Sequence, residues 1–177
     1  STCAIRLMCV LIITDVLLAL NIGNSNVNYA VIDNGNVADS GRMATPKTGG
    51  VEELGSLIDR LSPRDIVAVS VVPTLTATLR DVAQTRGLPL LFADETTIPI
   101  EIRVDNPAAV GDDRLVNAYA ALRIHGAPAI VVDMGTATTF DVVGADGAFI
   151  GGAIAAGPGL SVDALAAERR SSHTCRW

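Results

Sequence analysis

The chain has 177 residues, of which 49% are hydrophobic and only 3% aromatic, and its net charge is −6 at pH 7. This length fits one large domain or two small ones, and the hydrophobic share is enough for a core of Val, Ile, Leu and Ala. The acidic balance and the lack of a basic run argue against a nucleic-acid-binding surface. The cysteines Cys3, Cys9 and Cys175 lie near the ends without metal-ligand spacing, so we expect no disulfide framework and a cytoplasmic location.

The N-terminal run over residues 4–20 is apolar, but Arg6 and Asp15 interrupt it. A membrane-spanning helix needs about 20 predominantly apolar residues, and no signal-peptide cleavage pattern closes this run. We therefore expect no membrane segment. Residues 1–15 are interpreted as an N-terminal extension, and residues 16–20 as the first core strand.

The first strand leads into the polar turn Asn-Ile-Gly-Asn-Ser-Asn over residues 21–26, and residues 27–32 predict the returning strand of a hairpin. Asn34-Gly35 then favours a two-residue turn into a third strand over residues 37–45. A small polar turn between two strands can offer backbone N–H groups and side-chain hydroxyls to phosphate oxygens.

Helices and strands alternate in the next part of the chain. Residues 49–61 have the spacing of an amphipathic helix, and residues 65–72 read as a buried strand. A second helix follows over residues 74–86, and a short strand over residues 88–93. This order predicts an α/β sheet with crossover helices.

The segment Gly111-Asp112-Asp113-Arg114 begins a further helix. A carboxylate in the first turn can act as a general base, and a neighbouring arginine can bind a substrate carboxylate. The helix macrodipole also favours Asp112 and Asp113 in a first turn without any catalytic role, and Arg114 could instead form a surface ion pair.

A second strand–turn–strand segment, IVVDMGTATTFDVV, spans residues 130–143. Its strand ends at Asp133, and a turn rich in Gly and Thr follows. Such a turn can hold phosphate oxygens, and the carboxylate beside it can hold a cation. A strand over residues 149–154 comes next, and then a helix that begins near Leu160, with Ser161 as its candidate cap.

Taken together, these segments resemble type III pantothenate kinase, a family of the actin-like ATPase and sugar-kinase superfamily. The motifs that carry the resemblance are LLALNIGNSNVNYAVID (17–33), VSVVP (69–73), NPAAVGDDRLVNAYAA (106–121), VVDMGTATTFDVV (131–143) and GAFIGGAIAAGPGLSVDALA (147–166). Motifs in this order are far more specific than a single Gly-rich loop.

The resemblance implies an α/β fold of actin-like ATPase (ribonuclease H-like) domains, with one phosphate loop in each of two lobes. We expect a complete first lobe over residues 16–126 and only the start of a second lobe over residues 127–168. Residues 169–177 have no apolar periodicity and are interpreted as an aberrant tail.

The function implied is ATP-dependent phosphorylation of pantothenate to 4'-phosphopantothenate, the first committed step of coenzyme A biosynthesis. The implied cofactors are ATP, Mg²⁺ and a monovalent cation, K⁺ or NH₄⁺. The implied partners are the small-molecule substrate pantothenate and a second copy of the chain in a homodimer, without nucleic acid or membrane.

The resemblance also assigns residues to roles. The first phosphate loop would comprise Asn21, Ile22, Gly23, Asn24, Ser25, Asn26, Val27 and Asn28. The pantothenate site would comprise Gly111, Asp112, Asp113 and Arg114. Asp113 would be the base that accepts the proton of the attacking hydroxyl, Asp133 would hold the monovalent cation, and Thr136 would contact ATP from the second phosphate loop.

Two positions depart from the family pattern. Asn21 stands where the family has an aspartate, which keeps the size of the side chain but loses its charge. Val104 stands where the family has a tyrosine that lines the pantothenate pocket. These departures, with the absence of the family's C-terminal part, predict impaired activity. They also favour an alternative, a non-catalytic homologue that binds nucleotide or has a regulatory role.

Overall fold

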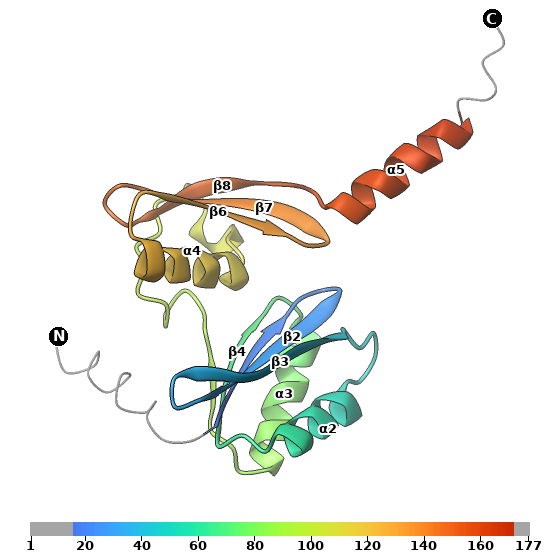
Figure 1. The fold of residues 1–177 in the computed structure, drawn as a ribbon, viewed down its shortest axis with the longest axis vertical. Helices are drawn as coiled ribbons and strands as arrows, with labels where there is room; N and C mark the ends of the chain where they lie inside the picture. Colours follow the sequence, from blue (N-terminus) through green and yellow to red (C-terminus); the bar gives the residue numbers. More distant parts are fainter. Residues whose placement is uncertain (1–15, 172–177) are drawn as a thin grey trace, which may run out of the picture. The chain divides into compact units, whose positions relative to one another are not determined.

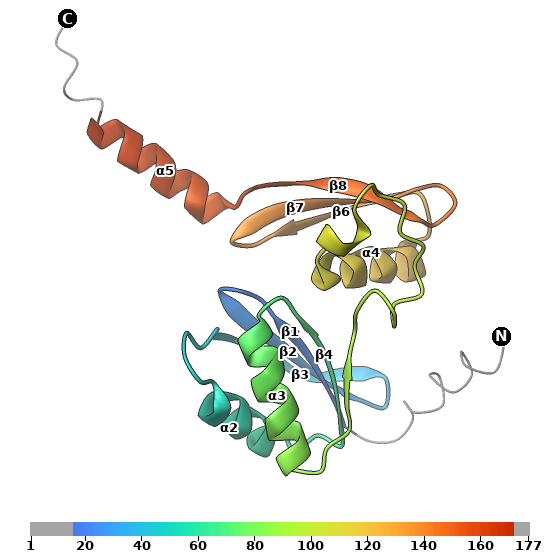
Figure 2. The ribbon, with the colours of Figure 1, turned by 180° about the vertical axis from the view of Figure 1, so that it is seen from behind.

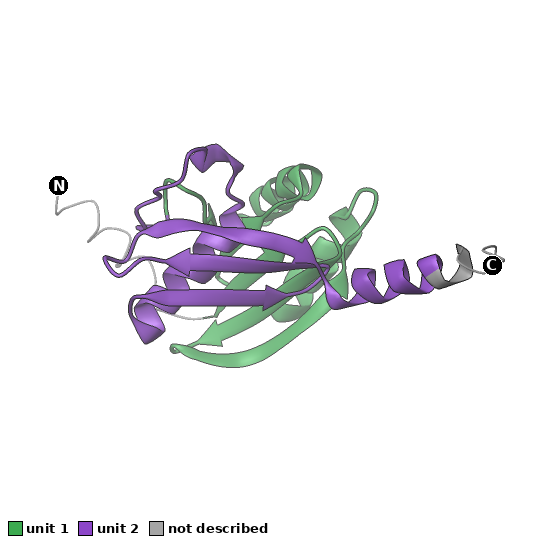
Figure 3. Cartoon of the chain, turned by 90° about the horizontal axis from the view of Figure 1, so that it is seen from above, with its two compact units in different colours: residues 1–97 green, residues 98–177 purple. Residues whose placement is uncertain are grey.

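A computed structural model describes residues 16–171 of the chain. The chain divides into two compact units, residues 1–97 and residues 98–177 (Figure 3). The expected N-terminal extension over residues 1–15 lies outside the described residues, as do residues 172–177 of the expected tail. None of the described helices is long and apolar enough to cross a membrane.

Unit 1 is built on a mixed sheet with the strand order β3-β2-β1-β4-β5 (Figure 1). Its strands are β1 (Leu17–Ile22), β2 (Asn26–Asp33), β3 (Asn36–Ala44), β4 (Asp65–Ser70) and β5 (Leu90–Phe92). The hairpin strands β1, β2 and β3 pair antiparallel, whereas β4 runs parallel to both β1 and β5. The α/β alternation predicted from the sequence is therefore present in this unit.

The turn between β2 and β3 shows how local sequence sets the register. Asn34 and Gly35 have φ angles of 48° and 79°. Positive φ at both central residues is the requirement of a two-residue type I′ hairpin turn, which Asn-Gly meets with little strain. The turn places Asp33 opposite Asn36, as the Asn-Gly pair predicts.

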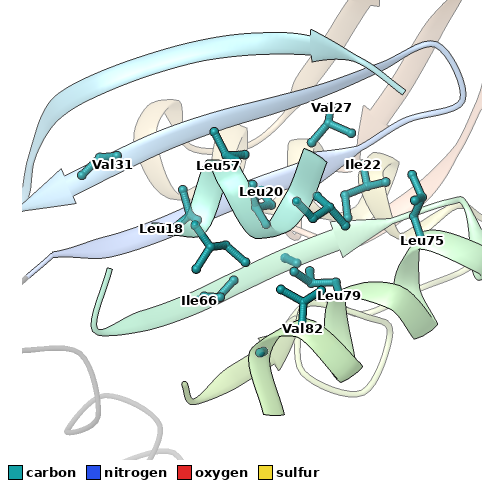
Figure 4. Packing of buried hydrophobic residues seen from close by; sticks show 14 residues of the cluster. Leu18, Leu20, Ile22, Val27, Val31, Leu57, Ile66, Leu75, Leu79 and Val82 are labelled. Carbon is teal, nitrogen blue, oxygen red and sulfur yellow. The ribbon is translucent and has the colours of Figure 1, made fainter. Parts of the chain in front are cut away.

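Two helices cover one face of this sheet, α2 (Val51–Leu61) and α3 (Pro73–Thr85) (Figure 2). Alternate residues of β1, namely Leu18, Leu20 and Ile22, point to that face and are buried. They pack with apolar side chains of both helices, including Leu57 and Leu79 (Figure 4). Burial of such side chains is the main source of stability in this unit.

Unit 2 contains an antiparallel sheet with the order β6-β7-β8. Its elements are η1 (Pro107–Ala109), α4 (Asp112–His125), β6 (Ala129–Met134), β7 (Ala137–Val143), β8 (Phe149–Ala156) and α5 (Pro158–Ser171). Helix α4 packs against one face of the sheet, and α5 continues beyond the end of β8 (Figures 1 and 2).

One sequence expectation in this region differs from the structure. Helix α5 begins at Pro158, so Ser161 is inside the helix, and its N–H donates to the carbonyl oxygen of Gly157 at 2.9 Å. The Ser161 cap was wrong because proline is well suited to a first helical position. The helix also continues to Ser171, into the expected tail. The expected lobe boundary at residues 126 and 127 falls within unit 2, and it stays a prediction.

Candidate functional site

The predicted first phosphate loop is the turn between β1 and β2 in unit 1. The N–H of Gly23 donates to the carbonyl oxygen of Asn26 at 3.0 Å, which closes the turn. Thr45, which follows β3, fixes it from the side. Its Oγ1 donates a hydrogen bond to the carbonyl oxygen of Gly23 at 2.6 Å. Its N–H donates a hydrogen bond to the carbonyl oxygen of Ser25 at 3.0 Å. Asn24, Ser25 and Asn26 are exposed at the tip.

The remaining residues of this loop divide between the two faces of the sheet. Ile22 and Val27 are register partners and are fully buried, so their side chains belong to the core and only their backbones are available to a ligand. Asn21 and Asn28 are also register partners and lie on the opposite face. Asn21 is half-buried and Asn28 is exposed.

The predicted second phosphate loop is the turn Gly135-Thr136 between β6 and β7. The N–H of Gly135 donates to the carbonyl oxygen of Ala137 at 2.9 Å, and the N–H of Gly157 donates to the carbonyl oxygen of Thr136 at 3.0 Å. A Cβ atom at Gly157 would lie only 2.1 Å from the carbonyl oxygen of Gly135. The junction between β8 and α5 therefore supports this turn through a contact that needs glycine.

Asp133 lies near the end of β6 and is exposed. Its Oδ2 accepts a hydrogen bond from Nδ2 of Asn117 on α4, at 3.3 Å. The carboxylate oxygens of Asp133 and the amide oxygen of Asn117 are hard ligands, and oxygen atoms of this kind can coordinate a monovalent cation. No group of three or more His, Cys, Asp or Glu side chains with metal-site geometry occurs in residues 16–171.

The predicted substrate motif forms the N-terminus of α4, with Gly111 at the N-cap and Asp112 and Asp113 in the first turn. Oδ1 of Asp113 accepts a hydrogen bond from the N–H of Arg114 at 2.9 Å. The helix is fixed by Leu115, which is fully buried one position after Arg114. A half-buried carboxylate at a helix N-terminus is held by the positive end of the macrodipole.

Arg114 is paired with a buried carboxylate that the sequence analysis did not single out. Nε and Nη2 of Arg114 both lie 2.6 Å from Oδ1 of Asp141 on β7. Asp141 is fully buried, and the Arg114 side chain is 14% exposed. Arg114 is therefore an ion-paired residue, but its partner lies inside the unit and not on the surface.

Opposing effects act on the Asp141 carboxyl group. Burial raises its pKa above the ordinary value of 3.8, because the charged form loses its hydration. The hydrogen bond and the charge of Arg114 act in the opposite direction, and the nearby charge of Asp113 adds to the upward shift. Burial is the largest of these effects, so the net direction is upward.

The sequence does carry a signal for Asp141. Aspartate is depleted in strands, and here it stands between Phe140 and Val142 in an apolar strand. The period of two puts Asp141 on the same face as Thr139 and Val143, and the structure buries this face at Asp141 and Val143. A carboxylate on a core face needs a charged partner. Thr45 and Asn117 carry no comparable signal.

The predicted residues thus form one group in each unit. The structure brings Asp113, Arg114, Asp133 and Thr136 onto α4 and the hairpin of β6 and β7 in unit 2, whereas residues 21–28 form the turn in unit 1. Acids, an arginine and glycine-rich turns in this arrangement can bind a small carboxylate, phosphate oxygens and a cation.

Comparison with known proteins identifies the matching family. A family model described as type III pantothenate kinase matches residues 17–173. The type III pantothenate kinase of Thermomicrobium roseum is 41% identical over 160 residues, which are 84% of this chain and 62% of that protein. That of Frankia alni is 40% identical over 157 residues, 85% of this chain and 63% of that protein.

Among solved structures, the ethanolamine utilization protein EutJ from Carboxydothermus hydrogenoformans matches 90% of this chain and 58% of its own, with a TM-score of 0.51 and 16% identity. This likeness concerns the fold, and the expected fold class of α/β actin-like ATPase domains is confirmed. The chain spans about 63% of the length of the curated relatives that it matches.

Proposed function

The chain belongs to the type III pantothenate kinase family, and we propose that it carries the phosphate loops and the substrate motif for ATP-dependent phosphorylation of pantothenate. In this reaction the primary hydroxyl of pantothenate attacks the γ-phosphorus of ATP. The bond from that phosphorus to the β,γ-bridging oxygen breaks, ADP leaves, and 4'-phosphopantothenate forms. Phosphoryl transfer asks the protein for positioning and charge neutralisation more than for covalent chemistry.

Asp113 is the proposed base. It lies in the first turn of α4, where its carboxylate is half-buried and directed by the N–H of Arg114. A base must stand within hydrogen-bonding reach of the hydroxyl whose proton it accepts. The adjacent Arg114 supports this assignment, because its guanidinium can hold the carboxylate of pantothenate beside the base. Gly111 and Asp112 complete the proposed substrate motif.

The single observation that carries the proposal is the buried pair of Arg114 and Asp141 next to Asp113. This pair joins the N-terminus of α4 to β7 through a hydrogen bond and an ion pair, which favours a defined position for Arg114 beside Asp113. A fixed geometry of this kind is what positioning of two reactants requires.

Nucleotide binding is assigned to the two loops. Residues 21–28 would hold phosphate oxygens through the backbone of the exposed tip and the amides of Asn21 and Asn28. Thr136 would contact ATP from the second turn. Asp133, with Asn117 beside it, would hold K⁺ or NH₄⁺. Magnesium would enter with the nucleotide and neutralise phosphate charge. We include a homodimer and a cytoplasmic location in the proposal.

The test measures ADP formation from ATP with and without pantothenate, for the chain and for Asp113→Asn. We expect pantothenate-dependent turnover that falls by at least about 100-fold in the variant, the lower end of the range for loss of a general base. Asp163→Asn, which removes an exposed carboxylate of α5, is the matched control and should leave turnover unchanged. A folded chain that consumes no ATP in response to pantothenate would contradict the proposal and favour the non-catalytic alternative.

A further inference from the structure

Arg114 occupies a position that electrostatics disfavour. It is the third residue of α4, where the positive end of the macrodipole repels a cation. Its side chain is also largely removed from water, which carries a desolvation cost. A cation in such a place needs a compensating anion, and β7 supplies it.

The compensating anion is Asp141, on the middle strand of the order β6-β7-β8. Its Oδ1 accepts a hydrogen bond from Nε of Arg114 at 2.6 Å, and Nη2 lies 2.6 Å from the same oxygen in the ion pair. The carbonyl oxygen of Phe140 lies 3.4 Å from Nη2, and the ring of Phe149 lies 5.8 Å from the guanidinium carbon. These contacts restrict the guanidinium plane on one edge and one face.

The free space for this guanidinium depends on a glycine. Gly152 of β8 is the register partner of Asp141. A Cβ atom at Gly152 would lie 2.6 Å from Nη2 of Arg114 and 1.9 Å from the carbonyl oxygen of Phe140. Any larger residue would therefore displace either the guanidinium or the strand.

We propose that Asp141 is a positioning residue that holds the guanidinium of Arg114 in place to bind the carboxylate of the substrate, an inference that rests on the proposed function. Within the part of the chain that the structure describes, the contacts of Arg114 occupy Nε and Nη2. The planar guanidinium carries a second terminal nitrogen, Nη1, whose N–H donors we assign to the carboxylate of the substrate. A buried ion pair is an inefficient way to stabilise a fold, which favours a positioning role.

The experiment replaces Asp141 by Asn in the full chain and measures KM for pantothenate, KM for ATP and kcat. We expect KM for pantothenate to rise by about 10-fold to 100-fold, the range for a charge-assisted contact that loses its orientation, while KM for ATP stays within about twofold. The matched control is Asp146→Asn, which breaks the exposed pair of Asp146 with Arg103 in the same unit. It should change neither constant.

A double-variant cycle separates positioning from a structural role. If Asp141 acts through Arg114, Asp141→Asn adds no further rise in KM for pantothenate once Arg114 is already alanine. The double variant removes both charges of the buried pair, so we expect it to lose less stability than a variant that leaves one charge unpaired. An additive effect, or an unchanged KM in a folded Asp141→Asn chain, would overturn the inference.

Failure of the proposed function is distinguishable from failure of this inference. If the unmodified chain shows no turnover with pantothenate, the kinase proposal fails, and the NMR signal of the Arg114 Nε–H group decides the positioning role. A slowly exchanging signal that disappears in Asp141→Asn supports it. A signal that is the same in both chains overturns it.

Discussion

Asn21 lies in a regularly paired strand but carries a neutral amide in place of a charged carboxylate. The strand pairing on both sides of it is regular, with Asn28 on β2 and Val69 on β4 as register partners. Its amide therefore lies where the resemblance leads us to expect an aspartate, but without the negative charge. A neutral oxygen can still accept hydrogen bonds, yet it neutralises no charge on a magnesium–nucleotide complex.

We predict that Asn21→Asp raises kcat by about 10-fold, because a carboxylate would hold a divalent cation near the phosphates more strongly than an amide does. The measurement is pantothenate-dependent ADP formation at saturating ATP and magnesium. Asn36→Asp adds the same charge at an exposed turn of the same unit and should leave kcat unchanged. A lower or equal kcat for Asn21→Asp would show that the amide is not the limiting departure.

Much of the fold at the level of elements could be predicted from the sequence. The strand over β1, the turn at Asn34-Gly35 and the amphipathic helix α2 follow from local periodicity and turn chemistry, which act over a few residues. The fixed partner of Arg114 could not be predicted in the same way. It lies 27 positions away on another element, so it depends on how α4 packs across the sheet and on the register of β7.

The junction between β8 and α5 contacts the turn that we propose as the second phosphate loop. We predict that Gly157→Ala raises KM for ATP by at least about 10-fold, because the added Cβ would come within 2.1 Å of the carbonyl oxygen of Gly135 and must displace the turn. Gly159→Ala is the matched control, since a Cβ there meets nothing within 4 Å. An equal KM in both variants would mean that this turn does not contact the nucleotide.

Helices α2 and α3 are joined by an ion pair with a defined dependence on pH. Nε of Arg86 lies 2.6 Å from Oδ1 of Asp59. The hydrogen bond from Arg86 lowers the pKa of Asp59 below its ordinary value of 3.8. A carboxyl group with a lowered pKa contributes stability above its unfolded pKa, and that contribution is lost as the pH falls through the folded pKa.

We therefore predict that Arg86→Gln lowers the Tm of unit 1 at about pH 6, and that the difference from the unmodified chain shrinks as the pH falls below 3.8 through the lowered pKa of Asp59. Because both side chains are partly exposed, salt should also reduce the difference. Thermal unfolding at several pH values checks this. Arg42→Gln, at an exposed arginine of β3, should show no such pH-dependent difference. A difference that persists in acid would assign the effect to packing of the Arg86 stem.

At the scale of the whole molecule, the two units bury their sheets to different extents. In unit 1 the buried side chains of β1, α2 and α3 form one cluster. In unit 2 the face of the sheet away from α4 keeps large apolar side chains exposed, among them Ile130, Val132 and Met134. The residues that can carry chemistry in unit 2 gather on the α4 side, where Arg114 and Asp141 are buried.

This contrast leads to a prediction about folding. Residues 16–97 expressed alone should unfold in one cooperative thermal transition, because their core is built from side chains within that range. In this fragment Leu79→Ala should lower the free energy of unfolding by about 2–5 kcal/mol, since Leu79 is fully buried on α3. Leu91→Ala removes the same atoms from a side chain that is 44% exposed and should cost less than half as much. A broad, non-cooperative transition, or equal losses in the two variants, would show that unit 1 depends on unit 2 for its core.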